Sequence, residues 1–213
     1  MLLTWYGNCC FLLKTNLGKR ILFDPIEYKD SSSCIIPNCD IVAISHSFFN
    51  NTYIKSNYPN SIIIDTPGIF TFNEINIECI QTFHDDFNGF KRGKNMIFIV
   101  TIDNLRLCHL GHIGHLPEKK VLEKLMNIDI LLIPLQRTFT LNGDLAAKLC
   151  AAILPKYVIP MNYSSSDLFF YDDFTKLSQS IKIIYNLKSS TIDLDEVKQS
   201  NTTEINLLLP KST

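Results

Sequence analysis

The sequence has no excess of charge of either sign. Its 213 residues contain 20 Lys and Arg against 21 Asp and Glu, which leaves a formal net charge of −1. A protein that binds nucleic acid or an anionic membrane surface through its charge needs a broad basic field. We therefore expect neither nucleic acid nor a membrane among its partners, and the sequence leaves its oligomeric state open.

Long apolar runs are also missing. The run from Ile128 to Leu135 is interrupted by Asp129 and Pro134, and it falls far short of the ~20 residues that a membrane-spanning helix needs. The first residues show no positive region ahead of an apolar stretch, which a secretory leader would have. We expect a soluble protein that stays in the cytoplasm.

The seven cysteines include no Cys-x-x-Cys pair. An odd number of cysteines without paired spacing is typical of a protein in the reducing cytosol. A chain of this length buries roughly 70% of its unfolded surface, so it needs neither disulfides nor a structural metal to fold, and any metal would serve chemistry. Because linkers, repeats and low-complexity segments are absent, we predict a single domain over residues 1–213.

Short strands dominate the hydrophobic pattern. Apolar or alternating stretches between turn signals predict strands at residues 2–6, 9–14, 19–23, 41–44, 61–64, 75–83, 96–102, 105–108, 129–133, 157–160 and 205–209. Helical spacing is present only late, once after Pro117 and once before Pro155. This order predicts sheets that pack on each other and are covered by helices, an α/β or α+β layered fold.

The five histidines follow predicted strands. His46 follows one buried strand, His84 follows another, and His109, His112 and His115 follow a third. Side chains at strand ends on one edge of a sheet can converge, and neutral imidazole is a common ligand of zinc, copper and iron. The spacing alone leaves two interpretations open, a metal site or unrelated capping and core histidines.

Several short motifs occur in a fixed order over residues 2–163. They are Gly7-Asn8-Cys9-Cys10, Asp24-Pro25, Ile44-Ser45-His46, His84-Asp85-Asp86, Gly111-His112 and Pro160-Met161-Asn162-Tyr163. Together they resemble the metallo-β-lactamase-fold hydrolases, and among these the cytosolic proteins similar to the ascorbate-phosphate lactonases. The resemblance implies an α/β fold of four layers, an αββα sandwich, with a metal site at one edge between the sheets.

The family carries a His-x-His-x-Asp-His signature that holds two metal ions. The aligned stretch here, His46-Ser47-Phe48-Phe49-Asn50-Asn51, keeps only the first histidine. Phenylalanine cannot bind a metal, and a neutral amide is a poor ligand for a divalent cation. Of the seven positions that the resemblance implies as ligands, two keep the family residue; the seven are His46, Phe48, Asn50, Asn51, His84, His112 and Asn162. The resemblance therefore implies that a two-metal site does not form.

Two hypotheses follow for function. In the favoured one, the fold persists without catalysis and without a cofactor, and the old cleft binds a small molecule; its lining residues are Ser47, Asn50, Asn51 and Asn162. In the alternative, the protein hydrolyses an ester, lactone or phosphodiester with one zinc ion. His46, His84 and His112 then supply three imidazoles, and water takes the fourth position. The first is favoured because several ligands are lost together.

We interpret the neighbouring residues as structural. His109 and His115 cap loops or fill space beside Gly111 and Gly114, which permit close approach of the backbone.

Asp24 fixes its loop, and Asp85 and Asp86 are solvated. Gln136 and Arg137 follow Pro134 where similar proteins have two glycines, and their long side chains would fill part of the cleft.

Overall fold

The strands form two sheets. A computed structural model describes residues 1–26, 38–46, 51–163, 170–179, 181, 183–195 and 202–211. The first sheet has the order β13-β1-β2-β3-β4-β5, with bounds Thr191–Asp193, Leu2–Gly7, Cys10–Lys14, Arg20–Phe23, Ile41–Ala43 and Ile62–Ile64. The second has the order β12-β14-β11-β10-β9-β8-β7-β6, with bounds Ile183–Asn186, Glu204–Leu207, Tyr157–Met161, Ile130–Pro134, Leu105–His109, Lys94–Ile102, Ile75–Phe83 and Gly68–Phe72.

The main core lies between these sheets. Alternate residues of a strand point to opposite faces, so Trp5 of β1 and Phe11 of β2 meet Phe98 and Val100 of β8 in one apolar cluster. Cys10, next to Phe11 in β2, belongs to a separate cluster on the outer face of the first sheet. Side chains that alternate in direction along a strand thus belong in turn to the inner and to the outer layer.

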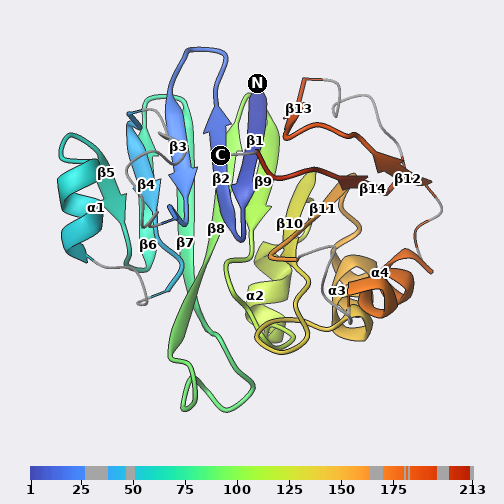
Figure 1. The fold of residues 1–213 in the computed structure, drawn as a ribbon. Coiled ribbons are helices and arrows are strands. Elements are labelled where there is room, and N and C mark those ends of the chain that lie inside the picture. Colours follow the sequence, from blue (N-terminus) through green and yellow to red (C-terminus); the bar gives the residue numbers. More distant parts are fainter. Residues whose placement is uncertain are drawn as a thin grey trace.

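Helices cover the two outer faces (Figure 1). The helix α1 (Asn51–Asn57) packs on the first sheet, where Ile54 is buried with Tyr58. The second sheet is covered by α2 (Lys119–Lys124), α3 (Gly143–Ile153) and α4 (Phe170–Ser178). The order helix, sheet, sheet, helices is the predicted four-layer αββα sandwich, which is confirmed. Within the described residues, no helix is both long and apolar enough to cross a membrane.

Some elements differ from the sequence prediction. The strand β6 and the helices α1 and α4 were not expected. The helix α1 has only seven residues, too few for a clear helical period, and α4 carries the acidic pair Asp172 and Asp173 on a helix whose inner side is apolar. The helix predicted after Pro117 is α2. It ends at Lys124, so Leu125 and Met126 lie after the helix and not on it.

One edge of the sandwich collects the ends of several strands. In the first sheet β3 and β4 are parallel, and in the second sheet β9, β10 and β11 are parallel, so each set ends at a common edge. Met96 N at the start of β8 donates a 2.7 Å hydrogen bond to Ser45 O after β4. This bond joins the two sheets where the predicted site residues lie.

Candidate metal centre

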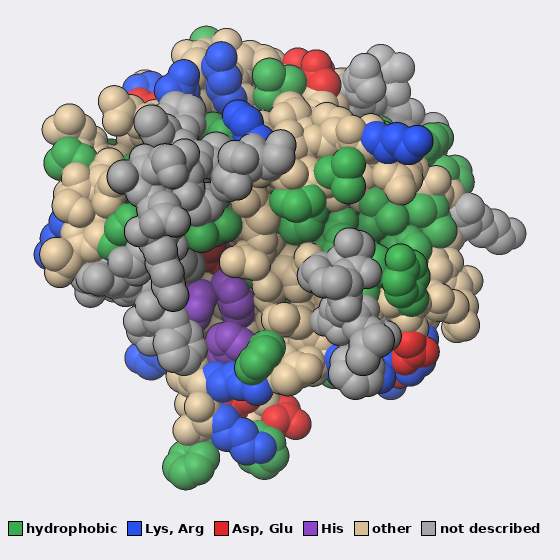
Figure 2. Space-filling view, in the orientation of Figure 1, with side chains coloured by type: hydrophobic (Ala, Val, Ile, Leu, Met, Phe, Trp, Pro, Cys, Tyr) green, Lys and Arg blue, Asp and Glu red, His purple; other side chains and the backbone are tan. Residues whose placement is uncertain are grey.

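A cavity of about 580 Å³ opens at this edge. Its lining residues are Asn8, Cys9, Asp24, Ile26, His46, His84, Arg92, His112, Gln136, Phe139 and Asn162. They come from segments that follow β1, β3, β4, β7, β9, β10 and β11. Figure 2 shows histidine side chains gathered in a hollow of the surface next to basic side chains.

The three predicted metal histidines lie side by side in this cavity. The ring centroids of His46 and His112 are 4.0 Å apart, those of His84 and His112 are 5.5 Å apart, and those of His46 and His84 are 5.8 Å apart. Imidazoles bound to one tetrahedral zinc at 2.0–2.1 Å have centroids roughly 5 Å apart. The residues come from three loops distant in sequence, and the fold brings their rings together in one cavity.

Ser45 connects two of these imidazoles to a buried carboxyl group. Its Oγ lies 2.7 Å from Asp24 Oδ2, 3.3 Å from His46 Nδ1 and 3.2 Å from His112 Nδ1. The short distance to Asp24 favours the serine hydroxyl as donor to that carboxyl group. Both imidazoles then donate Nδ1–H to Ser45 Oγ, and each keeps the lone pair on Nε2.

The loop after β9 places His112 through close backbone contacts. Asn95 Oδ1 accepts a 2.7 Å hydrogen bond from His112 N. Gly111 has a φ of +61°, and a Cβ there would lie 2.4 Å from Asn95 Oδ1. A Cβ on Gly114 would lie 2.3 Å from His84 O. The two glycines permit the close approach of their backbone to Asn95 and His84, as predicted from the sequence.

Burial sets the protonation of the site. It lowers the pKa of His46 to about 4 and, together with the neighbouring imidazoles, holds the pKa of His112 well below its usual value. Burial also lowers the pKa of His84. The three rings are therefore neutral near pH 7, which is the form that binds metals. Burial raises the pKa of Asp24 to about 7, although two hydrogen bonds from Ser45 oppose that shift.

Comparisons with known proteins show the family to which the chain belongs. A family model for the beta-lactamase superfamily domain matches residues 2–162. The chain belongs to this superfamily. It is 26% identical to a metal-dependent hydrolase of Methanosarcina barkeri, across 90% of this chain and 98% of that protein. It is also 26% identical to a metal-dependent hydrolase of Polynucleobacter asymbioticus, across 78% of this chain and 75% of that protein.

A solved structure from Thermotoga maritima has the same fold. That protein is described as a Zn-dependent hydrolase of the metallo-beta-lactamase superfamily. The superposition has a TM-score of 0.74 with 28% sequence identity, and it covers 98% of this chain and 99% of that one. The architecture and the sequence family therefore agree along nearly the whole chain.

The donors of this beta-lactamase superfamily protein fit a single metal ion. His84 is only 5% exposed, and its Nδ1 is buried without a hydrogen-bond partner among the described residues. An unpartnered buried nitrogen is costly, and a bound cation would satisfy it.

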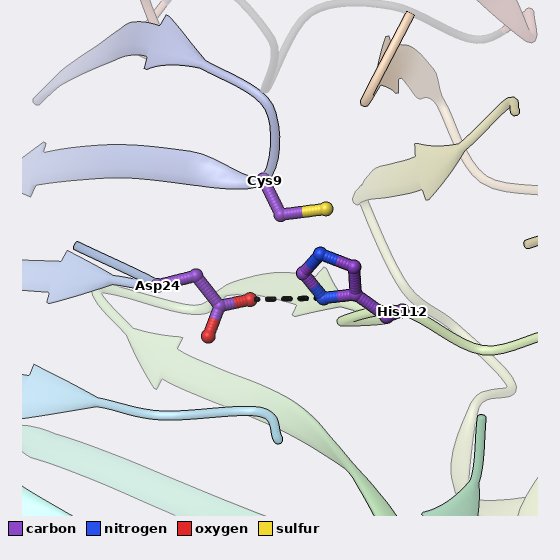
Figure 3. Close-up of side chains that lie close together, drawn as sticks. All are labelled: Cys9, Asp24 and His112. Atoms are coloured by element: carbon purple, nitrogen blue, oxygen red, sulfur yellow. Dashed lines mark ion pairs between the residues drawn. The ribbon is translucent and has the colours of Figure 1, made fainter. Parts of the chain in front are cut away.

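A second donor group shares His112. The ligand-type atoms of Cys9, Asp24 and His112 all lie within 4.8 Å of one another. Figure 3 shows the three side chains facing a common point from the β1–β2 turn, the end of β3 and the loop after β9; its dashed line joins Asp24 Oδ2 and His112 Nδ1, which are 3.6 Å apart. Sequence reasoning missed Cys9, since one cysteine in an apolar stretch carries no spacing signal.

The structure describes only some of the predicted cleft-lining residues. Asn162 lines the cavity, where its Nδ2 donates to Gln136 Oε1 at 3.2 Å. Asn51 opens α1, and nothing is described of its side chain. Ser47 and Asn50 lie outside the described residues.

His109 and His115 have local roles. His109 is fully buried; its Nε2 lies 2.8 Å from Cys9 O, and its Nδ1 accepts from Gly111 N. His115 Nδ1 lies 2.8 Å from Leu116 O. Neither residue lines the cavity, in agreement with the structural interpretation.

The surroundings of the acidic residues Asp24 and Asp85 differ in part from the expectation. Asp24 fixes its loop by accepting from Ser45 N and Oγ, as predicted, but it also lines the cavity. Asp85 is buried, not solvated, because its carboxylate accepts four backbone N–H groups of the β7–β8 loop. These bonds outweigh burial and lower the pKa of Asp85. Of the pair expected to fill the cleft, Gln136 lines it, whereas Arg137 turns away to Asp173 of α4.

Proposed function

We propose that this protein is a hydrolase that uses one zinc ion, held by His46, His84 and His112, to cleave a small ester, lactone or phosphodiester. The observation that carries the proposal is the convergence of three neutral imidazole rings in one cavity, with centroids 4.0–5.8 Å apart. Three histidines with an open fourth position are a recognised catalytic zinc set. The relatives named metal-dependent hydrolases support the same reaction class.

The proposal includes the loss of the two-metal centre that the family resemblance implies. Amides line the cavity at Asn8 and Asn162. The family resemblance implies a histidine at each of these two positions and an aspartate that bridges both metals at the position of His112. Neutral amides are poor ligands for a second divalent ion. We also assign the chain to the branch similar to ascorbate-phosphate lactonases, in the reducing cytosol; the six described cysteines are buried as thiols, which supports that location.

The side chains around the histidines suit a small polar substrate. Arg92 lies at the cavity wall with its guanidinium carbon 4.6 Å from the ring centroid of Phe139. A planar cation of this kind binds carboxylate or phosphate groups well. Gln136 and Asn162 offer amide donors and acceptors, while Phe139 and Ile26 supply apolar surface. These groups would orient an anionic substrate toward the histidines.

A zinc ion, when bound, would lower the pKa of a coordinated water to about 7. The chain itself supplies a group that can hold a proton in the same pH range. Asp24 lines the cavity with a pKa raised by burial to about 7, and Ser45 keeps its carboxyl group in place. In the metal-free protein Asp24 can therefore take up or release a proton near neutral pH without leaving its position.

A second candidate function is the binding of a small ligand without catalysis. The hydrogen bond that Asn162 Nδ2 donates to Gln136 Oε1 in the cavity lining favours it, because amides are common in binding sites and have no role as acid or base. In this case the histidines would be hydrogen-bonding groups, and no metal would be needed.

Metal content and turnover separate the two candidates. Protein purified without chelator and supplied with zinc should hold about one equivalent and hydrolyse a nitrophenyl ester, a simple lactone or bis(nitrophenyl) phosphate. His46→Ala should lose both zinc and turnover, whereas His115→Ala, the same change at a histidine outside the cavity, should keep them. Less than about a tenth of an equivalent of zinc in the wild type, with ligand-induced thermal stabilisation, would support the binding function instead.

A further inference from the structure

Cys9 differs from the other described cysteines in its surroundings. It lines the cavity of the metal centre, whereas the remaining described cysteines are not among the lining residues. Its thiol donates to Gly111 O over 3.6 Å, a long and weak bond. The Sγ atom is thus held at the cavity by the fold of the β1–β2 turn and not by a strong hydrogen bond.

The ring of His112 separates Cys9 from Asp24. Nδ1 of the ring faces Asp24, and the other ring nitrogen faces the side of Cys9 (Figure 3). In metal-binding histidines the nitrogen that does not bind the metal usually donates its N–H to an acceptor that orients the ring; here Ser45 Oγ and Asp24 lie on that side. The geometry therefore divides the group into an orienting carboxyl group and two candidate ligands.

We infer that Cys9 binds the metal ion of this centre through a thiolate, next to Nε2 of His112, and that the centre therefore selects thiophilic ions such as Zn²⁺, Co²⁺ and Cd²⁺ over Mn²⁺ and Mg²⁺. The inference rests on the proposed function, because it concerns the same ion. On a tetrahedral zinc, sulfur at about 2.3 Å and nitrogen at about 2.0 Å lie roughly 3.5 Å apart. In the protein, the ligand-type atoms of Cys9 and His112 lie within 4.8 Å of each other, so a small movement brings the thiol to such a distance.

Charge balance supports a cation at this point. A thiolate at Cys9 and a carboxylate at Asp24, both buried at this point, would repel each other. A divalent ion compensates two negative charges, so the thiol can give its proton to solvent as the metal–sulfur bond forms. Soft thiolate ligands favour zinc and related ions, while magnesium and manganese favour oxygen.

The thiolate need not close the centre to substrate. Three imidazoles and one thiolate fill a tetrahedral zinc, but catalytic zinc can expand to five ligands. The predicted consequence is therefore a change in metal preference, which can be measured without any substrate.

Cobalt titration tests the inference directly. Metal-free wild-type protein, kept reduced, should bind one Co²⁺ and develop the near-ultraviolet thiolate-to-cobalt charge-transfer band. Cys9→Ser should lose that band and bind Zn²⁺ more than about 100-fold more weakly, since even outer-shell changes cost 10–100-fold. Cys150→Ala on α3, a buried thiol outside the cavity, should keep the band.

A second measurement needs no variant and guards against misfolding of Cys9→Ser. X-ray absorption of the zinc-loaded wild type should require one sulfur scatterer at about 2.3 Å beside nitrogen at about 2.0 Å. Metal bound only by nitrogen and oxygen would overturn the role of Cys9 and leave the proposed function intact. Failure of the wild type to bind Co²⁺ or Zn²⁺ would overturn both.

Discussion

Two cavities of similar size lie at opposite edges of the sandwich. The metal centre encloses about 580 Å³, and a second cavity encloses about 620 Å³. The second lies at the turns that join β2 to β3, β6 to β7 and β8 to β9, since its lining includes Leu17, Asn73 and Ile102. Volume therefore does not distinguish the two.

The chemistry of the linings does. In the second cavity the charged groups are exposed to solvent: Lys19 Nζ lies 2.7 Å from Asp40 Oδ1, and Glu74 is exposed beside them. In the metal centre Cys9, Asp24 and His84 are buried, the pKa values of Asp24 and of the three histidines are displaced, and one nitrogen of His84 has no partner among the described residues. A functional site is indicated by buried groups that have displaced pKa values or lack a hydrogen-bond partner, and not by the volume of the cavity.

Ser45→Ala tests the most distinctive contact of the metal centre. The change removes the hydroxyl between Asp24, His46 and His112, so the two imidazoles lose the group that sets their tautomer. We expect zinc affinity to fall about 10–100-fold, measured by competition with a chromophoric chelator. Ser56→Ala on the exposed side of α1 is the matched control. Equal zinc affinity in the two variants would show that Ser45 does not orient the ligands.

His109→Gln separates a structural histidine from the cavity histidines. Burial lowers the pKa of His109 to about 4 in the folded protein, against about 6.5 when unfolded. The stability that neutral His109 contributes is thus complete above pH 6.5 and is lost as the pH falls from 6.5 to 4. We expect the free energy of unfolding of metal-free protein to fall in this window, with up to about 1.4 kcal/mol per pH unit due to His109.

The glutamine variant should lack that share of the pH dependence, because Gln does not titrate. The lowered pKa values of His46, His84 and His112 change the free energy of unfolding with pH in the same direction as His109 does. The raised pKa of Asp24 changes it in the opposite direction. These groups remain in both proteins, so the difference between the two urea-denaturation series isolates His109. Identical pH slopes would mean that His109 is not the buried neutral imidazole described above.

The sequence predicts the layers better than the site. The apolar runs of β2 and β8, which are buried along nearly their whole length, and the alternation of β7 follow from which faces are buried, so strands and sheet packing could be predicted from hydrophobic pattern. The convergence of His46, His84 and His112 needed the family resemblance as well, because it depends on where three separate loops end.

Contacts made across the chain could not be predicted. Ser45 stands next to His46 in sequence, yet its bonds to Asp24 and His112 depend on the two sheets meeting at this edge. Cys9 is likewise 15 residues from Asp24 and 103 from His112 by their numbers in the chain. Hydrophobic periodicity carries no information about such pairings.

Lys19→Ala tests the other side of the comparison, and its expected effect is the smallest. The Lys19 and Asp40 side chains are 52% and 38% exposed, so water screens their attraction and competes for both groups. Lys19 also lowers the pKa of Asp40, which should return toward its usual range in the variant. We expect the free energy of unfolding to change by about 0–1 kcal/mol, with no change in zinc affinity, by denaturant titration and the same chelator competition. A loss of zinc binding would show that the two edges of the sandwich are coupled, because the pair itself lies among the turns farthest from the histidines.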